Sequence, residues 1–152
     1  MSDLPPTPLD PNRRDALVAE AREVRRHAYA PYSHFQVGAA LLTRGGEIFT
    51  GVNVENCAFG STICAERHAV GAAVAAGARD LFAVAVVARA DHPVAPCGAC
   101  RQVLAEFDLA WVVLHNLGDG RTHVEPLAAL LPTAFLAPEL ARRPGGDATS
   151  LG

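Results

Sequence analysis

Two short cysteine motifs constrain this chain more than any other feature of its sequence. The first, Cys-Ala-Glu-Arg, occupies residues 64–67, and the second, Pro-Cys-Gly-Ala-Cys-Arg-Gln, occupies residues 96–102. Each motif stands at the start of a run with helical spacing of its apolar residues. If the two helix starts fold together, the thiolates of Cys64, Cys97 and Cys100 surround one point, as in a tetrahedral metal site.

The predicted site has three cysteine ligands and an open fourth position. Structural zinc sites are normally closed by four protein ligands, whereas catalytic sites keep one position for water or substrate. Glu66 follows Cys64 by two residues and can face that position, so it is the predicted catalytic residue. A structural zinc site would need Cys57 or His68 as its fourth ligand. We expect instead that Cys57 is a small buried residue and that His68 is a surface or packing residue of the second helix.

The charge of such a site requires compensation. A zinc ion with three thiolates has a formal charge of minus one, which makes a bound water less acidic than at a three-histidine site. The N-termini of the two helices present partial positive charge to the sulfur atoms. We expect Arg67 to add a guanidinium group that is hydrogen-bonded to one or more thiolates.

The hydrophobic pattern predicts a three-layer α/β/α domain, with a mixed sheet of about five strands and helices on both faces. Asn12 is expected to cap the first helix, and Gly71 with the neighbouring alanines is expected to let the second helix pack closely on the sheet.

Both cysteine-bearing helices follow strands, so their N-termini should meet at the end of the sheet where open α/β folds hold their sites. Helices are expected over residues 13–28, 64–76 and 127–131 and after residue 97, and strands over residues 36–43, 47–54, 81–88, 111–115 and 122–125.

Composition narrows the class of protein. We expect one domain over residues 13–136, between a flexible N-terminal segment of residues 1–12 and a flexible C-terminal segment of residues 137–152. The net charge of −3, without basic blocks, offers no footprint for nucleic acid. No apolar run reaches the roughly 18 residues of a membrane span. Four cysteines in a chain without a signal peptide indicate a reducing compartment, so a cytoplasmic protein is expected.

Cys-x-Glu followed by Pro-Cys-x-x-Cys is also the pattern of zinc nucleobase deaminases, in which the glutamate moves protons. The chain resembles cytidine deaminases of the small, homotetrameric, three-cysteine class over about residues 13–135. Three further segments carry the resemblance, in the order and spacing of the family: residues 30–40 (Ala-Pro-Tyr-Ser-His-Phe-Gln-Val-Gly-Ala-Ala), 53–56 (Asn-Val-Glu-Asn) and 130–135 (Leu-Leu-Pro-Thr-Ala-Phe).

The resemblance implies one zinc ion per chain and a nucleoside substrate in a homotetramer whose sites are completed across subunits. It implies that zinc-activated water attacks C4 of the cytosine ring while Glu66 shuttles the protons. The implied substrate contacts are stacking by Phe35, ribose hydrogen bonds from Asn53 and Glu55, a hydrogen bond from the Ala65 backbone N–H to the base carbonyl, and an aromatic ring, Phe135, lent to a neighbouring subunit.

The expected function is therefore zinc-dependent hydrolytic deamination of cytidine and 2′-deoxycytidine in pyrimidine salvage. A deaminase of an antibiotic cytosine nucleoside of the blasticidin type shares both cysteine motifs, although the segment at residues 53–56 favours an enzyme that recognises ribose. Outside the enzymes, Cys-x-x-Cys also fits a structural zinc module or a redox dithiol protein. Glu66 separates these classes, because a structural site has no use for a carboxylate at the open position.

Overall fold

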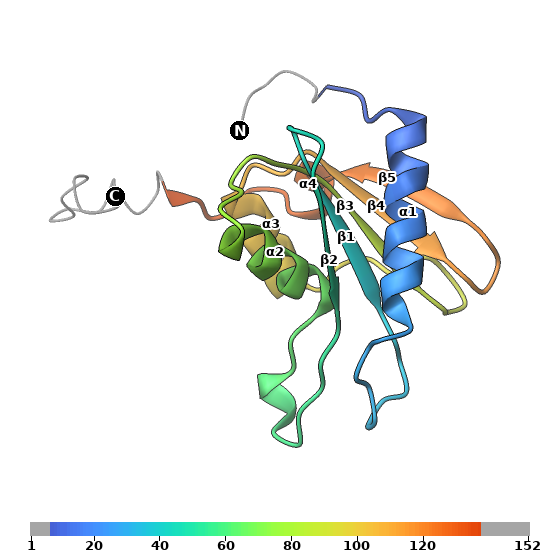
Figure 1. Ribbon diagram of the computed structural model, residues 1–152. Helices are drawn as coiled ribbons and strands as arrows, with labels where there is room; N and C mark the ends of the chain where they lie inside the picture. The colour runs from blue at the N-terminus through green and yellow to red at the C-terminus, as the bar shows by residue number, and fades with distance from the viewer. Residues whose placement is uncertain (1–6, 138–152) are drawn as a thin grey trace, which may run out of the picture.

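The computed structural model describes residues 7–137 and forms a single mixed sheet with helices on both faces (Figure 1). The sheet has five strands in the order β2-β1-β3-β4-β5. The pairs β1/β2, β1/β3 and β4/β5 are antiparallel, and β3/β4 is parallel. The elements are α1 (Pro11–Arg25), β1 (Gly38–Thr43), β2 (Ile48–Val52), the short 3-10 helix η1 (Phe59–Ser61), α2 (Ala65–Ala75), β3 (Leu81–Ala88), α3 (Gly98–Glu106), β4 (Trp111–Asn116), β5 (Thr122–Pro126) and α4 (Leu127–Leu130).

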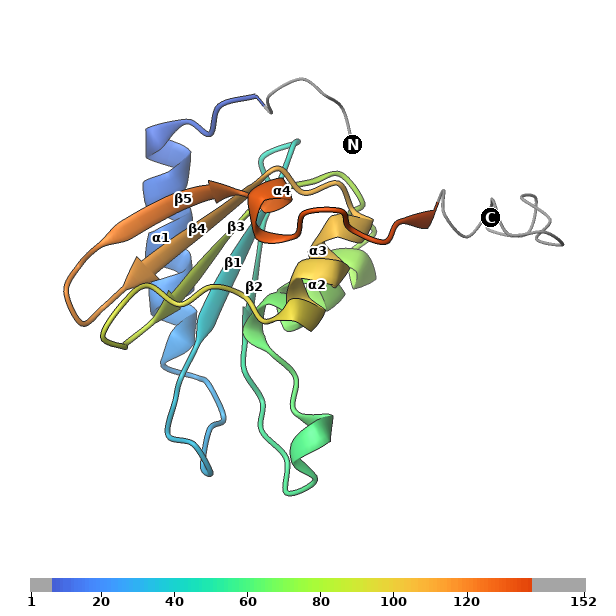
Figure 2. The ribbon, with the colours of Figure 1, turned by 180° about the vertical axis from the view of Figure 1, so that it is seen from behind.

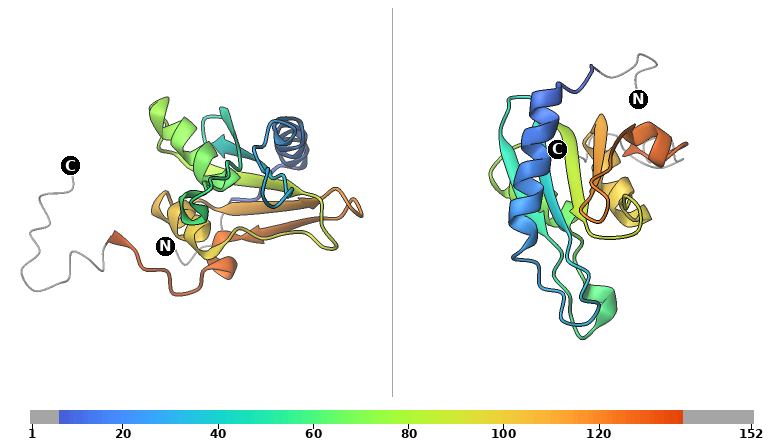
Figure 3. Two further views of the ribbon diagram at one scale, coloured as in Figure 1. Left: turned by 90° about the horizontal axis from the view of Figure 1, so that it is seen from below. Right: turned by 90° about the vertical axis from the view of Figure 1, so that its right-hand side faces the viewer.

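The expected three-layer architecture is confirmed. Helix α1 lies on one face of the sheet, and α2 and α3 lie on the other (Figure 3). Alternate residues of β1 divide between the two cores: Ala40 and Leu42 pack with α1, whereas Ala39 and Leu41 pack with α2 and α3. Strand β3 occupies the expected residues 81–88 and is buried along its whole length. A central strand covered on both faces needs apolar residues at every position, which explains its continuous hydrophobic sequence.

Helix α1 begins two residues earlier than expected, and its cap is Asp10 rather than Asn12. The Asp10 Oδ1 atom accepts hydrogen bonds from the backbone N–H groups of Asn12 at 2.9 Å and Arg13 at 3.1 Å. Pro11 takes the first helical position, where its missing N–H costs nothing. Pro11 and Asn12 are therefore helical, although they fall in the N-terminal segment that was expected to be flexible. Residues 1–6 and 138–152, which contain most of the two expected flexible segments, lie outside the described residues.

Close contact between β2 and α2 depends on Gly51, not on Gly71. A Cβ atom on Gly51 would lie 2.4 Å from both the Ala65 carbonyl oxygen and the Ala69 nitrogen, whereas one on Gly71 would meet nothing within 4 Å. The expectation that Gly71 packs on the sheet was wrong, because this residue lies on the exposed side of α2. The absent side chain of Gly51 lets the first turn of α2 rest on the end of β2.

None of the helices in the described part of the chain is long and apolar enough to cross a membrane.

Candidate active site

Helices α2 and α3 start side by side at one end of the sheet (Figure 2). Cys64 and Cys97 are the residues immediately before these helices, with extended backbone at φ −72° and −64°, and Cys100 lies in the first turn of α3. The free N–H groups and the positive ends of both helix dipoles are therefore near the three sulfur atoms. This arrangement favours the thiolate form that metal binding needs.

The three sulfur atoms have the spacing of a zinc site. The Cys64 and Cys97 Sγ atoms are 3.9 Å apart, those of Cys97 and Cys100 are 3.5 Å apart, and all three lie within 4.8 Å of one another. Zinc–sulfur bonds of about 2.3 Å at tetrahedral angles place two sulfur atoms about 3.8 Å apart. The three cysteines consequently fit one zinc ion without rearrangement of the helices.

Neither candidate for a fourth protein ligand reaches this group. The Nδ1 atom of His68 lies 3.0 Å from the carbonyl oxygen and 3.2 Å from the nitrogen of Val52. The His68 ring is therefore hydrogen-bonded to the backbone of β2. Cys57 is exposed in the segment after β2, which corrects the expectation that it would be buried. Within residues 7–137, no other His, Cys, Asp or Glu joins the three cysteines. The fourth position of the site is thus open for water or substrate, as catalytic zinc sites require.

Glu66 lies in the first turn of α2, two residues from Cys64, and is only 5 % exposed. Burial raises the pKa of its carboxyl group, and the negative charge of the Cys64 thiolate raises it further. Low solvation disfavours the charged carboxylate, so less energy is needed to protonate it than at a surface position. A carboxyl group with a raised pKa is a stronger base than an exposed one, so it can accept a proton and return it during a reaction.

Arg67 lies beside the sulfur atoms. Its interaction with the Cys64 thiolate raises the pKa of the guanidinium group, with a smaller contribution from Cys100. The Nη2 atom donates a hydrogen bond of 3.0 Å to the carbonyl oxygen of Thr62, whereas Nε is buried and meets no acceptor among the described residues. A positive group held against thiolates offsets the negative charge of a three-cysteine zinc site. Its role as a compensating charge stays a prediction.

The metal-free protein should contain an unusually acidic thiol at Cys64. Hydrogen bonds from Cys100 and Cys97, with the nearby Arg67, lower the pKa of Cys64 to about 5. The pKa of the Cys100 thiol is raised, because this thiol donates a hydrogen bond to Cys64 and is buried. After chelation, iodoacetamide at pH 6 should therefore modify Cys64 ahead of the exposed Cys57, because the lowered pKa of Cys64 leaves it largely as the reactive thiolate at that pH.

Peptide mass spectrometry of the alkylated protein measures this selectivity directly. Zinc-loaded protein is the control, in which Cys64 should be protected. Faster labelling of Cys57 than of Cys64 at pH 6 would contradict the prediction.

A surface cavity of about 340 Å³ is formed by the segment before β1 and the segment after β2. One wall is organised by Glu55, whose carboxylate accepts hydrogen bonds from the backbone N–H groups of Tyr32 at 2.8 Å and Ser33 at 3.2 Å and from the Ser33 hydroxyl. These bonds, above all the one from the Ser33 hydroxyl, lower the pKa of Glu55, which keeps it ionised. The cavity is lined by Tyr32, Ser33, Glu55, Phe59 and Thr62.

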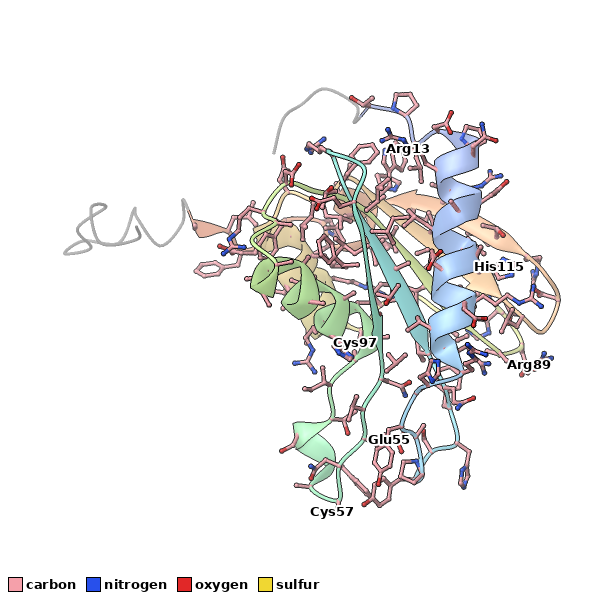
Figure 4. All side chains as sticks on the ribbon, viewed as in Figure 1. Arg13, Glu55, Cys57, Arg89, Cys97 and His115 are labelled. Carbon is pink, nitrogen blue, oxygen red and sulfur yellow. The ribbon has the colours of Figure 1, made fainter. Side chains whose placement is uncertain are left out.

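Sequence reasoning identified Glu55 but not the other four residues of this cavity. Tyr32 and Ser33 belong to the segment 30–40 that carried the family resemblance, which was the available signal. Their contact with Glu55 joins positions more than twenty residues apart, and no local pattern indicates it. Figure 4 shows Glu55 and Cys57 in the loop after β2, which extends from the sheet beside the loop that precedes β1.

Asn53 and Phe35 meet in the structure, although the roles predicted for them stay predictions. The Asn53 side chain is 8 % exposed, and its amide is bound to backbone at both ends. Its Oδ1 atom accepts a hydrogen bond of 2.8 Å from the Val37 nitrogen, and its Nδ2 atom donates one of 2.8 Å to the Phe35 carbonyl. Asn53 therefore orients the segment that carries the half-buried Phe35 ring.

Ala65 and Phe135, the other predicted substrate contacts, differ in exposure. Ala65 is fully buried as the first residue of α2, so its backbone N–H belongs to the unpaired N-terminal groups of that helix. Phe135 is 50 % exposed, so its ring is accessible for contact with another molecule.

Comparison with known proteins places the chain in a family. Residues 11–116 match the model of the cytidine and deoxycytidylate deaminase zinc-binding region, and this part contains all three cysteines and Glu66. A cytidine deaminase of Halalkalibacterium halodurans is 49% identical over 129 residues, which is 84% of this chain and 97% of that protein. A blasticidin-S deaminase of Bacillus cereus is 34% identical over 127 residues, which is 78% of this chain and 89% of that protein.

A solved structure shares the fold as well as the sequence. The crystal structure of cytidine deaminase from Burkholderia pseudomallei superposes with a TM-score of 0.76 at 49% sequence identity, covering 80% of this chain and 98% of that one. The motif spacing, the sulfur geometry, the sheet order and these relatives agree, and the chain belongs to the cytidine and deoxycytidylate deaminase family.

Proposed function

We propose that the protein is a cytidine deaminase, which hydrolyses cytidine and 2′-deoxycytidine to uridine and 2′-deoxyuridine and releases ammonia. The observation that carries this proposal is the juxtaposition of three sulfur atoms at zinc spacing, an open fourth position and a buried carboxyl group two residues from the first sulfur. A structural zinc site has no use for such a carboxyl group. Family membership and relatives at 49% identity support the same reaction class.

Cys64, Cys97 and Cys100 would hold the zinc ion. The bound ion would supply an acidified water molecule as the nucleophile for C4 of the cytosine ring. Glu66 accepts the proton that this water loses and delivers it to N3 of the ring as the tetrahedral carbon forms. Glu66 then takes the remaining proton from the hydroxyl group on C4 and passes it to the departing amino group, so ammonia leaves and a carbonyl remains. The buried environment that raises its pKa suits both steps, since the group must act as a base and then as an acid.

The cavity beside Glu55 is proposed to hold the ribose end of the nucleoside, because Glu55 is the one predicted substrate contact that lines it. Its volume of about 340 Å³ lies within the range of small-molecule pockets. Phe35 would stack on the pyrimidine, Asn53 and Glu55 would meet the ribose hydroxyl groups, and the Ala65 N–H would meet the base carbonyl. The carboxylate of Glu55 is already fixed in position by three donors, so it can accept from a sugar hydroxyl at little entropic cost.

We further propose a cytoplasmic homotetramer. Four large rings are well exposed in the single chain, and burial in subunit contacts would remove them from water. Phe135 would complete the site of a neighbouring subunit. Three thiols that must stay reduced for metal binding support a reducing compartment. The four exposed rings are Tyr29 at 57%, Tyr32 at 49%, Phe59 at 71% and Phe135 at 50%.

Ultraviolet absorbance of purified protein mixed with cytidine tests the proposal, because deamination removes the cytosine chromophore. Metal content is assayed on the same sample. Loss of the chromophore with one zinc per chain supports nucleoside deamination. Zinc without activity on cytidine or deoxycytidine would favour a deaminase of a modified nucleoside, the activity named for the 34% identical relative. Absence of metal would favour the dithiol alternative.

A further inference from the structure

Two adjacent residues of α3 fasten the C-terminal segment to the metal site. Arg101 donates a hydrogen bond of 2.7 Å from Nε to the carbonyl oxygen of Pro96, the residue before Cys97, and one of 2.8 Å from Nη1 to the carbonyl oxygen of Leu130. Gln102 donates a hydrogen bond of 2.6 Å from Nε2 to the carbonyl oxygen of Phe135. Arg101 and Gln102 are the two residues after Cys100. The helix that begins at the metal site is therefore hydrogen-bonded to the C-terminal segment as well.

The segment from residue 131 to residue 136 belongs to no helix or strand. It lies between the end of α4 at Leu130 and the last described residue, and it contains Thr133 at φ +57°, in the left-handed region. A non-glycine residue adopts that conformation where surrounding contacts impose it. The bond from Gln102 fixes the backbone of Phe135 while half of the side chain stays exposed. The backbone of Phe135 is therefore held by α3 while its ring remains accessible.

We propose that Gln102 is a positioning residue, which presents the ring of Phe135 to the active site of a neighbouring subunit. Arg101 ties the base of the same segment to the backbone before Cys97. The catalytic contribution of Gln102 is thus made in another subunit's site, through Phe135, and not in its own. This inference rests on the proposed function, because it needs a nucleoside site that Phe135 completes.

Gln102→Glu is the sharpest substitution, because it keeps the size of the side chain and replaces the N–H donor with a carboxylate oxygen. A carboxylate would also repel the carbonyl oxygen that it faces. Glu106→Gln is the matched control: it makes the reverse exchange one turn further along the same face of α3, at an exposed residue. Gln102→Glu should lower kcat/KM for cytidine about fivefold to tenfold, the effect of losing one hydrogen bond, mainly through KM.

A double-mutant cycle shows whether Gln102 acts through Phe135. Phe135→Ala should lower kcat/KM at least as much as Gln102→Glu, and the double variant should be no worse than Phe135→Ala alone. Glu106→Gln should have no effect. Additive losses in the double variant would overturn the inference, because they would mean that Gln102 acts independently of the ring.

Mixed oligomers then separate action within a subunit from action between subunits. Gln102→Glu chains are co-expressed with an excess of Glu66→Gln chains, which are expected to be inactive but still present Phe135 correctly. Each Gln102→Glu chain then has an intact catalytic site and an intact neighbour, so its activity should rise fivefold to tenfold, to the wild-type level. Phe135→Ala chains in the same mixture should recover in the same way.

Unchanged activity of Gln102→Glu chains in the mixture, with recovery of Phe135→Ala chains, would overturn the inference and leave the proposed function intact. Wild-type turnover of cytidine is measured first, so failure of the proposed function is seen before any mixture is made. Circular dichroism and zinc content of each variant confirm that the variants fold and bind metal.

Discussion

Replacing Glu66 with glutamine is expected to lower kcat/KM for cytidine by about 10²- to 10⁴-fold, the usual contribution of a general acid–base group. The substitution keeps the shape of a side chain that is 5 % exposed and packed in the first turn of α2. The glutamine side chain cannot accept protons from water, so it cannot pass them to N3 of the ring or to the departing amino group. Cysteine ligands are unchanged, so zinc content should stay at one ion per chain.

Stability measurements give an independent check on the same variant. The pKa of Glu66 is raised in the folded state, so the favourable effect of its protonated form is present at low pH and is lost as pH rises through the raised value. Metal-free Glu66→Gln should therefore gain stability over metal-free wild type as pH rises from about 4 to 8, as measured by urea unfolding. Retained turnover in this variant would refute the mechanism, and a stability difference independent of pH would contradict the raised pKa.

The main elements of the fold could be predicted because their signals are local. A continuous apolar run of eight residues is typical of a strand buried on both faces, and β3 has the expected bounds of residues 81–88. The sulfur cluster was also predictable, since Cys-x-x-Cys at a helix start fixes two ligands by helix geometry alone. Cys64 could be added because the helix that it precedes follows a strand of the same sheet.

The features that escaped prediction depend on contacts between distant parts of the chain. Ser33 and Glu55 meet only because the loops on both sides of the β1–β2 hairpin lie together. Gln102 is a solvent-facing helix residue by pattern, and its bond to Phe135 spans 33 positions. Cys57 was expected to be buried from its residue type, which says nothing about a loop that extends beyond the sheet.

Gly51→Ala is expected to lower both the stability of the protein and its affinity for zinc, although Gly51 is not a site residue. The effect acts through the contact between β2 and α2. The new Cβ atom would lie 2.4 Å from two backbone atoms, the Ala65 carbonyl oxygen and the Ala69 nitrogen. Backbone cannot move aside as a flexible side chain can, so α2 must shift from the strand. We expect a loss of about 3 kcal/mol in the free energy of unfolding, at the upper end of overpacking effects.

The same shift should weaken zinc binding, because α2 carries Cys64 and Glu66 while α3 carries the other two sulfur atoms. Sulfur spacings of 3.5 and 3.9 Å leave little room for displacement of one helix against the other. Gly71→Ala is the matched control in α2 itself: its Cβ atom meets nothing within 4 Å, so the helix should gain about 0.5–1 kcal/mol and keep its zinc. Competition with a chelator measures zinc affinity in both variants, and urea unfolding measures stability. Equal zinc affinity in Gly51→Ala and wild type would show that the metal site does not depend on how α2 rests on the sheet.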